Sequence, residues 1–165
     1  MNHFTRNQQV IGFIVWLGLC FGAAAIGAVA SVSAPEFYLQ LVRPAWAPPA
    51  GVFGPVWMML YALMGIAAWL VWRRAGYAAA NSALTLFLVQ LAVNALWSWV
   101  FFVWHLGGAA CLTILVLWVL IVATLLSFWR QAALAAVLLI PYLLWVSFAA
   151  FLNYSVWQLN PMLLG

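Results

Sequence analysis

The sequence predicts an all-α membrane protein that folds as a bundle of five transmembrane helices, and three observations carry that prediction. The chain of 165 residues is 70% hydrophobic and only 4% charged, whereas soluble domains carry about a quarter charged residues. Its apolar residues gather in five runs, each close to the ~20 residues that cross a bilayer as a helix. Most connections between these runs are short, which makes sequence neighbours antiparallel partners in space.

The five runs lie in one domain that covers residues 1–165, and we expect spans at about 10–32, 52–72, 80–104, 108–129 and 132–157. Only Arg130 and Gln131 separate the last two runs. A single helix through both would be ~75 Å long, more than twice the thickness of the hydrocarbon core, so the chain must turn near Arg130. The one long loop, residues 33–51, contains four of the seven prolines.

The first run has an alternative interpretation as a secretory signal peptide, because Arg6 precedes it and a Ser-Val-Ser-Ala sequence follows it at 31–34. Its ~20 apolar residues are more than the 7–15 that form the core of such signals. We therefore expect this helix to remain in the protein as its first span.

The arginines predict the orientation. With five spans, the N-terminus and the second and fourth loops share one side, which holds Arg6, Arg73, Arg74 and Arg130. The other side holds Arg43, offset by Glu36. Cytoplasmic loops carry the excess of basic residues. The pattern predicts a cytoplasmic N-terminus, with the proline-rich loop and the C-terminus on the far side. The short loops and the lack of a transit-like leader favour a multi-pass protein of a bacterial inner membrane.

The scarcity of ionisable groups excludes several functions. A single acid rules out paired-carboxylate catalysis and a carboxylate metal site, and no Ser-His-Asp set is evident. Five scattered arginines form no basic stripe, so we expect no nucleic-acid binding. No Asp, Glu or Lys lies in a span, which argues against ion-coupled transport. His3 and His105 are expected on opposite sides of the membrane, so they cannot both ligate one haem, although a single bond from His105 stays open.

The third run contains the densest group of polar residues. Gln90, Asn94 and Ser98 lie within a ~100° arc of one helix, together with Trp97 and Phe101. Amides and hydroxyls inside a membrane usually join helices by hydrogen bonds. Because aromatic rings share this face, the alternative is that it forms one wall of a ligand site.

The fifth run carries a second such face, and it comprises Trp145, Ala149, Leu152, Asn153, Val156 and Asn160. Pro141, one turn earlier, interrupts the hydrogen-bond ladder and can kink the helix. Trp57 on the second run is expected at a similar depth. Flat indole walls with a few amides suit a large planar apolar ligand, held below the proline-rich loop.

The first run has two stripes of small residues that would let helices approach closely. Gly18, Gly22 and Ala25 form one stripe, and the other comprises Ala23, Gly27 and Ala30. One stripe is expected to pack inside the bundle. The other serves either a homodimer or internal packing.

Two ordered motifs also carry a resemblance. The loop sequence Arg43-Pro44-Ala45-Trp46-Ala47-Pro48-Pro49, followed by Phe53 and Trp57, resembles the P-x-W-x-P-P loop of the translocator protein family, also called tryptophan-rich sensory proteins or TspO. The second motif is Pro141-Tyr142-Leu143-Leu144-Trp145, followed by Ala149, Leu152-Asn153, Trp157 and Asn160. Between them, Asn94-Ala95-Leu96-Trp97-Ser98 and Phe101-Phe102 are similar to the family's third helix. The resemblance covers nearly the whole chain.

This resemblance implies a dimeric five-helix membrane receptor or carrier for porphyrins, such as protoporphyrin IX and haem, and for benzodiazepine-type ligands. Its role would lie in tetrapyrrole transport, sensing or regulation, with the porphyrin as ligand and no required cofactor. The ligand-binding residues carried over by position are Tyr38, Trp46, Trp57, Asn94, Trp97, Phe101, Trp145 and Ala149. We add Asn153 from the face of the fifth run.

The resemblance also implies an alternative function, and the sequence differs from the family in one motif. Family members have been proposed to degrade porphyrins in light, and Trp57 and Trp145 would be the candidate catalytic residues of such an enzyme. Animal members carry a proposed sterol motif at the end of the fifth helix. Leu152 and Tyr154 match it, but no Arg or Lys follows Arg130, which puts high-affinity sterol binding in doubt.

Overall fold

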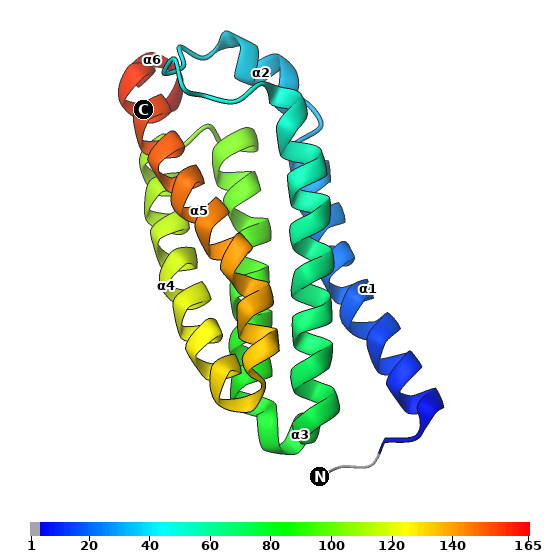
Figure 1. The fold of residues 1–165 in the computed structure, drawn as a ribbon. Coiled ribbons are helices and arrows are strands. Elements are labelled where there is room, and N and C mark those ends of the chain that lie inside the picture. Colours follow the sequence, from blue (N-terminus) through cyan, green and yellow to red (C-terminus); the bar gives the residue numbers. More distant parts are fainter. Residues whose placement is uncertain (1–3) are drawn as a thin grey trace.

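Four long helices make up most of the computed structural model, which describes residues 4–165 (Figure 1). They are α1 (Arg6–Ala30), α3 (Phe53–Ser98), α4 (Gly107–Gln131) and α5 (Ala133–Leu159). The shorter elements are α2 (Ala34–Gln40), the 3-10 turn η1 (Ala50–Val52), the π-helical turn η2 (Trp99–Val103) and α6 (Pro161–Leu164). Every element of the described chain is helical, as the sequence predicts.

Four segments of the described chain are long and apolar enough to cross a membrane: Arg6–Ala30, Ala50–Val103, Gly107–Gln131 and Ala133–Leu159. The second contains two of the predicted spans, joined within α3 at Gly76. Gly76 has φ 72° and ψ 166°, a conformation that a side chain disfavours. Figure 1 shows the chain turning back there into two legs of α3. The predicted short connection at 73–79 is therefore a tight turn at Gly76 between two helical legs.

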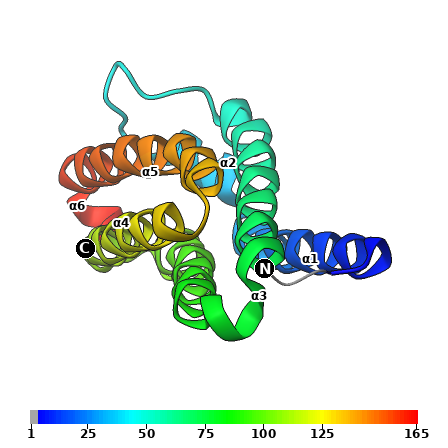
Figure 2. The ribbon, with the colours of Figure 1, turned by 60° about the horizontal axis from the view of Figure 1, so that its bottom comes forward.

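Helix α1 begins with a capping box, because the Thr5 hydroxyl accepts from the Gln8 amide and the Gln8 side chain accepts from the Thr5 amide. It packs along α3 and lies apart from α4 and α5 (Figure 2). One of its two small-residue stripes, Ala23, Gly27 and Ala30, is buried in the bundle. The other stripe is exposed on the monomer, with open space beside Gly18 and Gly22.

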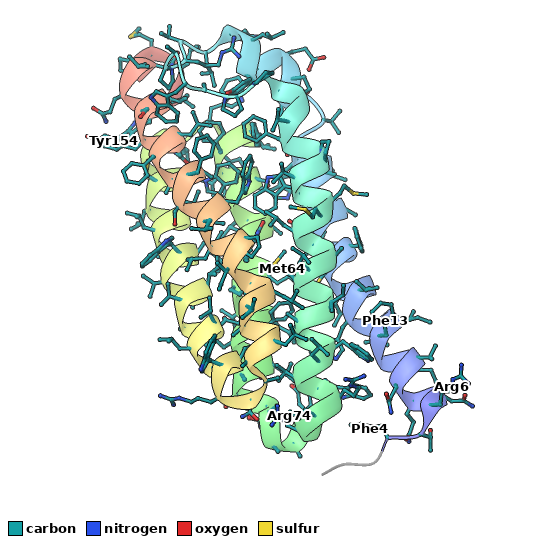
Figure 3. All side chains as sticks on the ribbon, viewed as in Figure 1. Phe4, Arg6, Phe13, Met64, Arg74 and Tyr154 are labelled. Atoms are coloured by element: carbon teal, nitrogen blue, oxygen red, sulfur yellow. The ribbon has the colours of Figure 1, made fainter. Side chains whose placement is uncertain are left out.

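The two ends of the bundle differ in charge. Arg6 and Arg74 lie at the same end (Figure 3), and the guanidinium of Arg73 lies 4.4 Å from the ring centroid of Trp69. Residues 33–51, which we call the capping loop, lie at the opposite end of the bundle (Figure 1). Helix α6 lies at that end too. The predicted long loop is thus partly helical, because α2 forms within it.

The core is packed most tightly in the half of the bundle near Gly76. Phe87 and Phe128 stack there with ring centroids 5.8 Å apart, and the edge of Trp16 meets Phe87 at 6.1 Å. These side chains and Leu139 are almost completely buried. The half below the capping loop instead encloses a cavity.

Candidate functional site: an aromatic cavity below the capping loop

A cavity of about 520 Å³ lies between α1, both legs of α3, α5 and the capping loop. Its volume falls in the range of small-molecule sites. Helix α1 contributes small residues to the wall, α3 and η2 contribute aromatic rings, and α5 contributes one indole and one amide. The lining includes Ala24, Gly27 and Ala28 from α1, Ser31 from its C-cap, Phe53, Trp57, Tyr61, Asn94, Trp97 and Phe101 from α3 and η2, and Trp145, Ala149 and Asn153 from α5.

The structure brings all but one of the predicted ligand-binding residues to this cavity. They are Tyr38, Trp57, Asn94, Trp97, Phe101, Trp145, Ala149 and Asn153. Trp46 lies outside the lining, where it is 51% exposed and its ring edge meets Phe148 at a centroid distance of 5.8 Å. The predicted juxtaposition of Trp57, Asn94 and Trp145 around one space is therefore present.

Ring contacts fix the orientation of the aromatic wall. Trp97 and Phe101 are stacked at 5.5 Å with an interplanar angle of 17°, one turn apart on the same helix face. Phe53 meets Trp145 edge-on at 5.9 Å, which joins the start of α3 to α5. Rings that pack on each other lose little rotamer freedom when a ligand enters, so this wall is preformed.

The floor of the cavity is a chain of buried hydrogen bonds. The Tyr61 hydroxyl donates to Oδ1 of Asn94 over 3.1 Å, and Nδ2 of Asn94 donates to the Tyr142 hydroxyl over 2.6 Å. That hydroxyl in turn donates to Oε1 of Gln90 over 3.0 Å. The chain links both legs of α3 to α5. Gln90 and Asn94 therefore join helices by hydrogen bonds. Asn94 also lines the cavity, so it belongs both to the contacts between helices and to the wall of the candidate site.

Both the oxygen and the nitrogen of the Asn153 amide form hydrogen bonds within the protein. Its Oδ1 accepts from Nε1 of Trp97 over 2.9 Å, and its Nδ2 donates to Sγ of Cys111 over 3.1 Å. The first bond holds the Trp97 indole against the cavity. Asn153 therefore orients an aromatic wall residue.

Two buried donors have no hydrogen-bond partner among the described residues: Nε1 of Trp145 and Nε2 of Gln90. A buried unpaired donor costs about 1–3 kcal/mol. The Trp145 ring lines the cavity, while its Nε1 has almost no accessible surface. A ligand acceptor would recover this energy if a small rotation of the indole turned the N–H toward the cavity.

The capping loop is fastened at two points. The Tyr38 hydroxyl donates to the carbonyl of Pro48 over 3.0 Å, and burial raises the pKa of this phenol while the neighbouring Arg43 guanidinium opposes the shift. Asn160, at the end of α5, accepts from the backbone N–H of Val42 and donates to its carbonyl, each over 2.8 Å. The loop is thereby tied to α5 above the cavity.

Asn160→Leu is expected to raise the dissociation rate of a cavity ligand about tenfold, because it removes two hydrogen bonds to Val42 that each contribute about 0.5–1.5 kcal/mol to holding the loop. Gln158→Leu is the matched control, since Gln158 is exposed two residues earlier on α5. Stopped-flow displacement measures the rate. Equal rates for both variants would show that the Val42 contact does not retain the ligand.

The remaining polar candidates lie away from the cavity. His105 has φ 53° and stacks on Phe37 at a centroid distance of 4.2 Å, outside the cavity lining. His3 lies outside the described residues. Within residues 4–165 no group of three His, Cys, Asp or Glu side chains is placed to hold a metal ion.

Two kinds of site residue were not predicted from the sequence. Tyr61 and Tyr142 complete the floor, and Tyr142 lies one turn before Trp145, so its place on the polar face of α5 was available from helical periodicity. The wall formed by Ala24 and Ala28 was not available, because small residues carry no signal that separates packing from a cavity lining.

Comparisons with known proteins agree with this architecture. Residues 14–158 match the model of the TspO/MBR family. The chain is 39% identical over 163 residues to "Tryptophan-rich protein TspO" of Chlorobaculum tepidum, covering 94% of this chain and 99% of that protein. It is 39% identical to "Protein CrtK" of Rhodobacter capsulatus (90% and 92% covered) and 39% identical to human "Translocator protein" (76% and 75% covered). The chain therefore belongs to the TspO/MBR family and is an integral multi-pass membrane protein.

Proposed function

We propose that this protein binds planar, largely apolar ligands of the porphyrin class, including protoporphyrin IX and haem, in the cavity below the capping loop. The same cavity would accept benzodiazepine-type ligands. The observation that supports this most strongly is the enclosure itself, which is about 520 Å³ and is walled by Trp57, Trp97, Phe101 and Trp145. Indole faces stack on planar rings, and the unpaired Trp145 N–H offers a donor to a ligand acceptor.

The biological role that follows is the transport, sensing or regulation of tetrapyrroles. Human "Translocator protein" and "Protein CrtK" are among the relatives, which supports a role in handling ligands within a membrane. Because no Asp, Glu or Lys lies in the lining, among the residues that the structure describes, any movement of ligand would be facilitated rather than driven by ion coupling.

The proposed arrangement has five membrane crossings, with each leg of α3 counted as one. It places the cluster of arginines at the end of Arg6 and Arg74 in the cytoplasm, which suits a bacterial inner membrane. The exposed stripe of Gly18, Gly22 and Ala25 is the proposed contact of a homodimer, because small residues let two helices approach closely.

The test of the binding function is a titration of the detergent-solubilised protein with protoporphyrin IX, followed by the shift of the porphyrin absorption band. Trp145→Phe keeps an aromatic wall but removes the unpaired donor. This variant is expected to weaken binding about fivefold, which corresponds to the free energy of one hydrogen bond, about 1 kcal/mol.

The matched control is Trp129→Phe, because Trp129 is 54% exposed near the end of α4 and lies outside the cavity lining. An affinity that is unchanged in Trp145→Phe would contradict the role given to its indole. Absence of saturable binding by the wild-type protein would contradict the function.

A further inference from the structure

Among residues 4–165, Arg43 is the one arginine at the end of the bundle that carries the capping loop. The other four basic residues are Arg6, Arg73, Arg74 and Arg130, and Arg6 and Arg74 lie at the opposite end (Figure 3). Arg73 adjoins Arg74, and Arg130 lies at the turn between α4 and α5, at the lower end in Figure 1. Of the arginines, only Arg43 can therefore meet a negatively charged ligand group at the cavity end.

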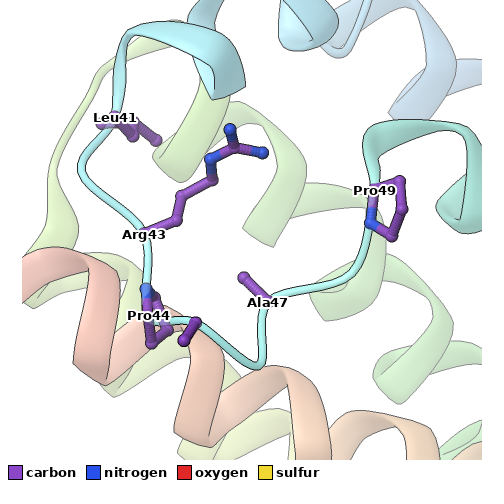
Figure 4. Close-up of a pocket in the computed structure, with 6 residues that line it drawn as sticks. Leu41, Arg43, Pro44, Ala47 and Pro49 are labelled. Carbon is purple, nitrogen blue, oxygen red and sulfur yellow. The ribbon is translucent and has the colours of Figure 1, made fainter.

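The side chain of Arg43 lies at an open hollow of about 440 Å³ in the loop, lined also by Leu41, Pro44, Ala47 and Pro49 (Figure 4). Its Cζ lies 4.7 Å from the ring centroid of Tyr38. The chain has a single acidic side chain, Glu36, and within residues 4–165 the structure pairs no carboxylate with Arg43. Apart from its contact with Tyr38, this guanidinium is available to another anion.

One aromatic ring separates the Arg43 guanidinium from the ligand cavity. Tyr38 is 6% exposed and lines the cavity, while Arg43 lies over its face. The edge of Tyr38 meets Phe53 at 5.6 Å, and Phe53 meets Trp145 at 5.9 Å. Arg43 is exposed and its side chain is long and flexible. It can therefore reach a ligand group that emerges beside Tyr38.

The cavity itself has no place for a ligand carboxylate. Its lining in the described chain consists of aromatic, aliphatic and small residues with neutral polar groups, and it contains no charged side chain. An ionised carboxylate buried there would lose its hydration without gaining a counter-charge. A ligand that carries carboxylates on one edge must therefore bind with that edge outside the cavity.

We propose that Arg43 binds the carboxylate groups of the ligand and so selects planar ligands with an acidic edge, orienting that edge toward the capping loop. This specificity rests on the proposed porphyrin binding. A planar guanidinium forms paired hydrogen bonds with a carboxylate, which lysine does not reproduce. The apolar edge of the ligand then faces the floor at Tyr61 and Asn94.

The experiment compares protoporphyrin IX with its dimethyl ester, which has the same macrocycle and no ionisable carboxylate. Both are titrated into the wild-type protein and Arg43→Gln in a maltoside detergent, which contains no phosphate. Arg43→Gln is expected to weaken binding of the free acid about tenfold, as for a charge-assisted hydrogen bond, and to leave binding of the ester unchanged. Arg43→Lys should restore part of the loss, and Arg74→Gln, at the other end, should have no effect.

The possible outcomes separate this inference from the function on which it rests. If neither porphyrin binds the wild-type protein, the proposed function fails. If both bind and Arg43→Gln changes neither, or weakens both equally, the porphyrin site stands and the selection by Arg43 is overturned.

A lipid phosphate is the other anion that this guanidinium would recognise. Titrations in mixed micelles that contain phosphatidylglycerol distinguish the two sources. A preference for the acid over the ester that persists in these micelles supports recognition of the ligand carboxylate. A preference that disappears would assign Arg43 to the lipid headgroup and overturn the proposal.

Discussion

Gly65→Leu is expected to lower the free energy of unfolding by about 3 kcal/mol, the upper part of the usual cost of overpacking a core. Gly65 is buried on α3 where α1 crosses it. A Cβ at this position would lie 2.7 Å from Cδ2 of Leu17 and 3.1 Å from its Cα. The side chain of Leu17 can rotate away, but its backbone can move only if α1 shifts as a whole.

The matched control is Gly18→Leu, the same substitution on α1, at the position that follows Leu17. A Cβ at Gly18 has no atom within 4 Å, so the monomer accepts the new side chain without repacking. Unfolding of both variants by sodium dodecyl sulfate, followed by circular dichroism at a dilution that keeps the protein monomeric, measures the difference. Similar stability of the two variants would show that α1 and α3 are not held in close contact at Gly65.

The Gly18 variant also tests the proposed dimer in a separate readout. If the exposed stripe forms the interface, Gly18→Leu lowers the dimer fraction at high protein concentration, as sedimentation would show. The stability of the monomer should stay unchanged, because the stripe faces away from the bundle.

Hydropathy was enough to predict the helical class of the chain, because a bilayer demands runs of fixed length. The two runs on either side of residue 76 show the limit of this reasoning. Their apolar pattern predicts two helices and a connection, whereas the backbone stays helical almost to Gly76, where a left-handed conformation turns the chain. Glycine allows that conformation, but hydropathy does not reveal where it is used.

The candidate site was predictable where a polar residue lies in an apolar span. Asn94 and Asn153 stand out for this reason, and both line the cavity. Their partners were not predictable, since the contact of Asn153 with Cys111 joins residues 42 positions apart. Trp46 was predicted to bind the ligand because its loop motif is recognisable. The direction of its ring, however, depends on packing against Phe148, which the motif does not reveal.

Asn94→Leu is expected to lower the free energy of unfolding by about 2 kcal/mol and to weaken binding in the cavity. The substitution keeps a side chain branched at Cγ, with two methyl groups in place of the amide, and so removes the acceptor for Tyr61 and the donor to Tyr142. Hydrogen bonds between membrane helices contribute about 0.6 kcal/mol on average and up to about 1.7 kcal/mol. The Tyr142 hydroxyl is fully buried, so the bond that it loses belongs at the upper end of that range.

A double-mutant cycle with Tyr61→Phe isolates the role of the amide. Tyr61→Phe alone removes one donor to Asn94, and the two substitutions together should cost less than the sum of the single costs. Ser98→Ala is the control, because it removes a hydroxyl from the cavity lining one turn further along α3 and leaves the chain from Tyr61 to Gln90 intact. Additive costs in the cycle would mean that Tyr61 and Asn94 act independently, and that their hydrogen bond does not stabilise the floor of the cavity.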